Sequence, residues 1–271
     1  MNLHQRILTY NDCYLRGQTI RPRGVMVHST GANNPNLSRY VGPDDGLLGQ
    51  NPNNNHWNMS GVGACVHAFI GRLADGSIAS YQTLPWNWRG WHCGSGRSGS
   101  ANNTHISFEI CEDGLDDREY FDAVYREAVE LTAHLCELYG LDPLEDGVVI
   151  CHSEGYRRGV ASNHGDVMHW FPKFGKNMDG FRADVSRVLK GDEDDMTQEQ
   201  FNQMMTEYER TKNPVPDNTP ADWEAPAVQW ARDNGLLAGD GAGNLMLHSN
   251  MTRAQFFVIL KKYHDHRKEI S

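Results

Sequence analysis

Two histidines end apolar strands, and one aspartate lies in the loop that follows the second. His28 ends the strand expected from the apolar run GVMVH (24–28), and His152 ends the strand expected from VVIC (148–151); each is followed by a serine. Asp166 lies in a loop rich in Asn, Gly and His (ASNHGDVMHWFP, 161–172). Two imidazoles and one carboxylate can bind zinc and leave its fourth position open for water, as a catalytic zinc requires. The alternative is that each histidine is structural, since the sequence has neither an HExxH motif nor a short Cys/His knuckle.

Glu109 is a charged residue within another apolar run, 106–111 (ISFEIC). Charged side chains are rarely fully buried unless they are paired. One interpretation is a carboxylate that faces a cleft, with its pKa raised for general-base catalysis. The alternative is an ordinary alternating strand with a solvent face, which Ser107 and Cys111 would share.

The elements that must position these residues follow from apolar periodicity. Short apolar runs predict strands at 24–28, 65–70, 77–82, 106–111 and 148–151, and the turn ADGS (74–77) predicts a hairpin. Apolar residues at alternating steps of three and four predict a long helix that ends at Gly140, formed by Phe121, Val124, Ala128, Leu131, Leu135 and Leu138. A second helix is expected at 179–190. Together these elements predict an α/β fold with a mixed central sheet flanked by helices.

Two breaks separate the C-terminal part from the rest of the chain. An acidic break (GDEDD, 191–195) and a Pro/Asn/Asp segment (NPVPDNTP, 213–220) surround a helix expected at 196–212. A helix near 221–234, a Gly-rich loop at 235–244 and a helix from Thr252 to about His264 follow. The predicted domains are therefore a catalytic domain at 1–190, a linker with a short helix at 191–220 and a small all-α module at 221–271.

Composition excludes several classes of protein. The 271 residues carry a formal net charge of −10 with no Lys/Arg block, so nucleic acid is not an expected partner. No run of 18 apolar residues exists, so no membrane span is expected. The first residues lack an apolar signal core, which predicts a protein that stays in the cytoplasm unless something else releases it.

The six cysteines contain no CxxC pair. In a reducing compartment they are expected to be free thiols, mostly buried. A Cys93–His152 nucleophile pair is the alternative catalytic chemistry, but nothing around Cys93 supplies the helix N-terminus that a thiolate prefers.

Three ordered segments carry a resemblance to a known family. They are VMVHST (25–30), THISFEICEDG (104–114) and CHSEGYRRGVASNHGDVMHWFPKFGKNMDGFR (151–182). They resemble the zinc N-acetylmuramoyl-L-alanine amidases (amidase type 2, the peptidoglycan-recognition-protein fold), particularly phage and prophage endolysins. The resemblance covers roughly residues 20–190.

The resemblance implies roles for individual residues. His28 and His152 fall on the zinc histidines of the family, Asp166 on its third ligand and Glu109 on its catalytic base. His164 stands where the family often has a lysine that stabilises the oxyanion. Val167 stands where a proline usually follows the third ligand, so His164 and then His169 are the fallback third ligands.

Two further segments resemble parts of such proteins. Trp91-His92 resembles a tryptophan–histidine stretch near the family's cleft, and His67 lies on an inner strand, so the three residues either line the cleft for substrate or pack. Residues 225–263 resemble a single S-layer-homology unit, in which Thr252 and Arg253 would bind an acidic secondary cell-wall polymer. The alternative for this unit is a small helical packing or oligomerisation module, which would make the protein a homo-oligomer.

The resemblance thus implies a Zn²⁺-dependent, bacteriolytic peptidoglycan hydrolase that cleaves the amide between N-acetylmuramic acid and L-alanine, as an endolysin does. Its partner would be bacterial peptidoglycan. The alternatives are a non-catalytic peptidoglycan-binding protein of the same fold and a zinc endopeptidase or sugar deacetylase.

Overall fold

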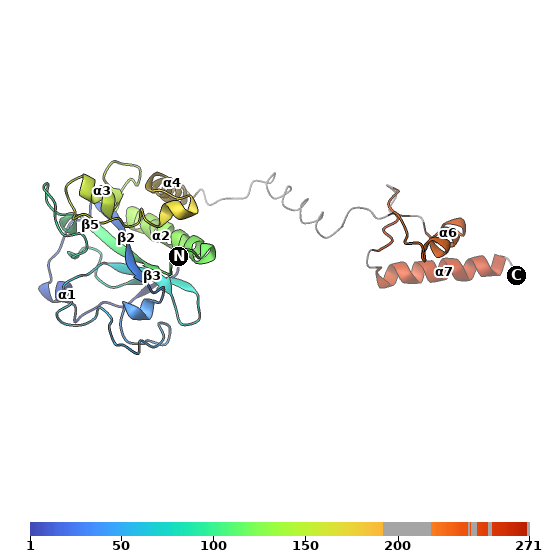
Figure 1. The fold of residues 1–271 in the computed structure, drawn as a ribbon, viewed down its shortest axis with the longest axis horizontal. Helices are drawn as coiled ribbons and strands as arrows, with labels where there is room; N and C mark the ends of the chain where they lie inside the picture. Colours follow the sequence, from blue (N-terminus) through green and yellow to red (C-terminus); the bar gives the residue numbers. More distant parts are fainter. Residues whose placement is uncertain (192–217, 238, 240–242, 249–250, 270–271) are drawn as a thin grey trace. The chain divides into compact units, whose positions relative to one another are not determined.

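The computed structural model describes residues 1–191, 218–237, 239, 243–248 and 251–269 (Figure 1). The chain separates into two compact units: unit 1 ends at Glu193 and unit 2 begins at Asp194. The helix expected at 196–212 lies outside the described residues. Within these described ranges, no helix is both long and apolar enough to cross a bilayer.

Unit 1 is built on one six-stranded sheet in the order β1-β4-β3-β5-β2-β6. Strands β3 and β4 pair antiparallel as the predicted hairpin, and the other neighbours pair parallel, so the sheet is mixed as expected. The strands are β1 Leu3–Gln5, β2 Gly24–Asn33, β3 Ala68–Arg72, β4 Ile78–Gln82, β5 His105–Glu112 and β6 Val149–Cys151.

Helices and short 3-10 turns complete the two units. The α-helices are α1 Asp12–Arg16, α2 Arg118–Tyr139, α3 His152–Arg157 and α4 Met178–Leu189 in unit 1, with α6 Ala225–Asp233 and α7 Arg253–Glu269 in unit 2. The 3-10 helices are η1 Leu37–Arg39, η2 Ala101–Asn103 and η3 Phe171–Phe174.

Helix α2 follows the predicted apolar stripe. The Asp117 side chain accepts a hydrogen bond from the Tyr120 N–H at its start, and Gly140, with a φ of 63°, ends it. Leu135 is fully buried, whereas Leu138, the last residue of the predicted stripe, is 53% exposed. The stripe therefore leaves the core one turn before the helix ends.

The two faces of the sheet have different roles. Val25 and Val27 of β2 and Phe108 of β5 pack in one core with α2 and α4. Side chains alternate along a strand, so His28 and Glu109 lie on the opposite face, here called the site face. The two residues are register partners in the parallel β2–β5 pair. The site face is therefore the side of the sheet away from α2.

Cys13 and Cys65 form a disulfide, which corrects the expectation that all six cysteines are free. Their Cα atoms lie 6.4 Å apart although 52 residues separate them in sequence. Both pack with Leu84 in a small apolar cluster, so the fold creates the contact and cysteine spacing could not predict it. The other four cysteines are free and buried, as expected: Cys93, Cys111, Cys136 and Cys151.

Unit 2 consists of α6, α7 and the segments around them. The Thr252 hydroxyl accepts a hydrogen bond from the Gln255 N–H at 3.2 Å, so Thr252 caps α7 as expected. None of the residues described in this unit is buried. Its large apolar side chains are exposed instead, among them Trp223, Trp230, Phe256, Phe257, Val258 and Leu260.

Candidate metal centre and active site

His28 lies in the middle of β2 rather than at its end, because the strand continues to Asn33. The imidazole is buried. Its Nδ1 lies 3.0 Å from Asp166 Oδ2, and its Nε2 lies 3.0 Å from His92 Nδ1. One ring nitrogen thus faces the acidic residue and the other faces a second histidine.

His152 is the first residue of α3, not the last residue of a strand. The joint between β6 and α3 is held by Glu154, whose Oε2 accepts a hydrogen bond from the Cys151 N–H at 3.1 Å. Arg182 of α4 donates to both carboxylate oxygens of Glu154 and to the Val149 carbonyl. These bonds hold the junction between β6 and α3 and thereby fix the direction of the His152 side chain.

The three predicted ligands come together from β2, α3 and the loop before η3. The His28 and His152 Nδ1 atoms lie 3.2 Å apart, and Asp166 Oδ2 lies 3.0 Å from the first and 3.4 Å from the second. Tetrahedral zinc with bonds of about 2.0–2.1 Å places neighbouring ligand atoms roughly 3.3 Å apart. The spacing of the His28–His152–Asp166 ligand atoms is therefore that of a group that could hold a zinc ion.

The electrostatics of the group favour a neutral imidazole beside an ionised carboxylate. Burial lowers the pKa of His28, against the raising effect of Asp166. Burial alone would raise the pKa of Asp166, but hydrogen bonds from His152 and His28 lower it well below its usual range. Neutral imidazoles and an ionised carboxylate are the forms that bind metal.

Glu109 lies on the site face, opposite His28 in the sheet register. Its Oε2 atom is buried and has no hydrogen-bond partner among the described residues. Burial first, and then the charges of Asp166 and Glu112, raise the pKa of Glu109 well above its usual value. A buried, unpaired carboxylate with a raised pKa near a possible metal site is typical of a proton-transfer group.

The two fallback ligands lie outside the three-residue group. His164 is exposed, and its ring centroid lies 4.7 Å from that of His152. Its Nδ1 is 3.2 Å from Ser162 Oγ. The Nε2 of His169 instead lies 2.8 Å from Glu112 Oε1. His164 thus stands beside the centre, and His169 belongs to a separate pair.

The three residues expected to line the cleft have different surroundings. Trp91 is 44% exposed and lies under the Arg89 guanidinium, so it is accessible to a ligand. His92 contacts His28 directly. His67 is fully buried, with Nε2 2.7 Å from the Trp88 carbonyl and Nδ1 accepting from the Ser107 N–H at 3.0 Å. Of the two alternatives for His67, cleft lining or packing, this placement favours packing, because both ring nitrogens are used inside the core.

Cys93 follows His92, which contacts His28, but it has the wrong environment for a nucleophile. Its thiol is buried, and burial raises the pKa of Cys93. The sulfur lies 3.3 Å from Asn102 Oδ1. A protonated, buried thiol does not support the cysteine alternative.

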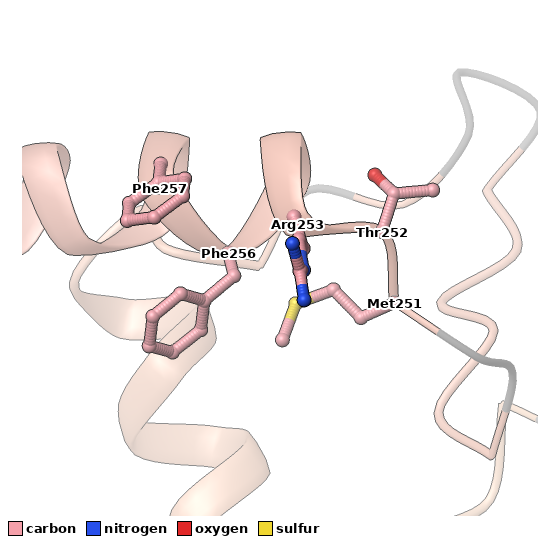
Figure 2. Close-up of a pocket in the computed structure, with 5 residues that line it drawn as sticks. All are labelled: Met251, Thr252, Arg253, Phe256 and Phe257. Carbon is pink, nitrogen blue, oxygen red and sulfur yellow. The ribbon is translucent and has the colours of Figure 1, made fainter.

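The C-terminal residues expected to bind wall polymer lie at a pocket of about 500 Å³ at the start of α7. Figure 2 shows its lining side chains: Met251, Thr252, Arg253, Phe256 and Phe257. The Thr252 hydroxyl is engaged with Gln255, while Arg253 is exposed. The pocket therefore combines one cationic side chain with apolar walls.

The chain belongs to the N-acetylmuramoyl-L-alanine amidase family, whose model matches residues 18–168. The match spans His28, Glu109, His152 and Asp166. No curated protein matches this chain in sequence.

Two solved structures are similar to this chain. One is the hydrolase AmiA of Staphylococcus aureus in complex with its ligand, at 20% identity and a TM-score of 0.50, covering 70% of this chain and 83% of that chain. Another is a mutant endolysin from Bacillus subtilis, at 23% identity and a TM-score of 0.45, covering 68% of this chain and 99% of that chain. At this identity the likeness to the first structure shows a shared fold.

Proposed function

We propose that this protein is a zinc-dependent peptidoglycan amidase that hydrolyses the amide joining N-acetylmuramic acid to L-alanine. The observation that carries the proposal is the His28–His152–Asp166 group. Its ligand atoms have the spacing of tetrahedral zinc in a chain that belongs to the amidase family. A zinc ion bound there supplies Lewis-acid chemistry, polarising the substrate carbonyl and making water more acidic.

Glu109 moves the proton. Its buried, unpaired Oε2 accepts the proton of the attacking water and then donates it to the leaving amine. The raised pKa of Glu109 brings both transfers closer to neutral pH. The amide bond breaks as the nitrogen receives this proton, so one residue serves both steps.

His164 and Trp91 act on the substrate. His164 stands at the exposed edge of the centre, where an imidazole N–H can donate to the oxyanion of the tetrahedral intermediate. The exposed ring of Trp91 offers a surface for a sugar or peptide.

Unit 2 holds the enzyme on the wall. The Arg253 fork, at the edge of an apolar pocket, suits a carboxylated sugar of a secondary cell-wall polymer. With unit 2 bound to the wall, the amidase would lyse the cell as an endolysin does, which is the role that the resemblance implies.

Product chemistry on purified peptidoglycan tests this function. We expect new L-alanine amino termini without new reducing ends, and turnover at least about 100-fold lower in a Glu109→Gln variant. Cleavage within the stem peptide would favour an endopeptidase, and release of acetate would favour a deacetylase. Wall binding without cleavage would favour a non-catalytic binding protein of the same fold.

A further inference from the structure

We propose that His92 and Ser162 are positioning residues that fix the tautomers of the two histidine ligands, and that both act through the single segment His92–Cys93. The inference rests on the metal centre of the proposed function. It assigns these residues a role apart from substrate contact.

The first half of the arrangement concerns His28. Its Nδ1 faces Asp166 and His152, so this nitrogen must be unprotonated to bind a metal. A neutral imidazole then carries its hydrogen on Nε2. The acceptor 3.0 Å away is His92 Nδ1. The Nε2–H of His28 therefore donates to His92.

His92 is suited to accept this bond because it is rigidly held. The fully buried Asn102 accepts hydrogen bonds from the backbone N–H groups of His92 at 2.9 Å and Cys93 at 3.1 Å. The ring thus stands on a fixed backbone.

The second half concerns His152 and ends on the same segment. Its Nε2 lies 3.3 Å from Ser162 Oγ, and that hydroxyl donates to the Cys93 carbonyl at 3.1 Å. The hydroxyl also lies 3.2 Å from His164 Nδ1. Since its single hydrogen goes to Cys93, its oxygen accepts from the Nε2–H of His152 and has a second lone pair for the Nδ1–H of His164. The Ser162 N–H also donates to the Cys93 carbonyl, at 2.8 Å, which fixes Ser162 in place.

Both ligands therefore carry their hydrogen on Nε2 and present Nδ1 to the metal. Outer partners of this kind set the tautomer and ring orientation of metal-binding histidines, and their loss typically costs about 10- to 100-fold in metal affinity. The segment His92–Cys93 couples the two orientations, although it supplies no ligand itself.

Zinc affinity of the whole chain, measured by competition with a chromophoric chelator, tests the assignment. His92→Leu removes the acceptor and is expected to weaken zinc binding about 10- to 100-fold. His92→Asn, whose Oδ1 stands near the former Nδ1, is expected to retain most of the affinity. Ser162→Ala is expected to weaken binding, and His134→Leu on α2 is the control that leaves it unchanged.

The outcomes separate this inference from the proposed function. Wild-type affinity in His92→Leu would overturn the positioning role, as would equal loss of substrate binding in His92→Leu and His92→Asn with zinc affinity unchanged in both. Failure of the wild-type protein to bind zinc would overturn the metal centre, and this inference with it.

A second measurement covers the case in which His92→Leu does not fold. Long-range ¹⁵N NMR of the zinc-bound wild-type protein reports which ring nitrogen is protonated and which binds the metal. We expect a protonated Nε2 and a metal-bound Nδ1 in His28 and His152. A hydrogen on Nδ1 of His28 in the zinc-bound protein would contradict the assignment.

Discussion

At the scale of the residue, one carboxylate oxygen of Glu109 is buried and has no hydrogen-bond partner among the described residues. Glu109 lies beside the His28–His152–Asp166 group, which could hold a metal ion. We predict that Glu109→Gln keeps the zinc content of the protein, because Glu109 is not a ligand. Turnover should fall about 10²- to 10⁴-fold, the usual contribution of a proton-transfer group. Metal analysis and the rate of amine release measure the two effects; a near-wild-type rate would show that another residue transfers the proton.

Asp166 is the proposed ligand with the weakest support from the sequence, because Val167 stands where the family usually has a proline. The structure nevertheless places its Oδ2 within 3.4 Å of both histidine nitrogens. We predict that Asp166→Ala lowers the zinc occupancy of the purified protein, since two imidazoles alone bind the ion weakly. Unchanged zinc content would move the third ligand elsewhere, first to His164.

His67 makes the stability of the fold depend on pH. Burial lowers the pKa of His67 from 6.5 to about 4. Between these two pH values the unfolded chain therefore binds a proton at His67 that the folded chain does not bind. Stability is therefore complete above pH 6.5 and falls as the pH drops through 6.5 toward 4. The full shift is worth about 3 kcal/mol.

Urea unfolding of the metal-free protein at pH 7 and pH 5 checks this dependence. We predict that His67→Gln, which keeps a donor toward Trp88, loses about 2 kcal/mol less between the two pH values than wild type does. Equal losses in the two proteins would mean that other groups cause the pH dependence.

At the scale of the element, α2 contains a matched pair of leucines one turn apart. Leu135 is fully buried and Leu138 is 53% exposed. We predict that Leu135→Ala lowers the free energy of unfolding by about 3 kcal/mol, because it leaves a cavity between α2 and the sheet. Leu138→Ala should change it by less than about 0.5 kcal/mol. Equal effects of the two substitutions in denaturant unfolding would contradict the observation that Leu135 faces the core and Leu138 faces solvent.

The elements with strong periodicity are those that the sequence predicts well. The α2 stripe, its end at Gly140 and the β3–β4 hairpin are local patterns, and the structure has all three. Strand β1 and helix α1 were not predicted, because three and five residues give too short a signal. The boundary between β6 and α3 was also misplaced by one residue: His152 begins the helix and does not end the strand.

Contacts between distant segments could not be predicted in this way. The candidate ligands could be found from the sequence, because two histidines follow apolar runs and Asp166 lies in the loop after the second. The contact of His92 with His28 could not, because it joins residues 64 apart in sequence. The Cys13–Cys65 disulfide and the burial of His67 likewise depend on how loops cross the sheet. Strand alternation places a side chain on a face and does not show what covers it.

At the scale of the whole molecule, the chain separates into two units with different surfaces. Unit 1 has an extensive core and contains the whole metal group, whereas unit 2 has no buried residue among those described. We predict that a chain ending at Glu193 folds, binds zinc like the full chain and pellets less with purified cell walls. Undiminished pelleting would show that unit 2 does not bind the wall.

A single substitution in the full chain locates the wall contact within unit 2. Arg253→Gln should weaken wall binding about tenfold, the loss expected for one charge-assisted hydrogen bond of about 1.5 kcal/mol. The affinity of the variant for zinc should equal that of the wild type. Wall affinity equal to that of wild type would remove Arg253 from the binding surface.

The central claim is that this chain hydrolyses the muramyl–alanine amide with a zinc ion bound by His28, His152 and Asp166. The most direct test is release of L-alanine amino termini from purified peptidoglycan by chelator-treated protein, before and after zinc is added back. The account predicts no release after chelation, recovery on addition of zinc, and no new reducing ends. Release that persists in the chelated protein, or no release with zinc bound, would contradict it.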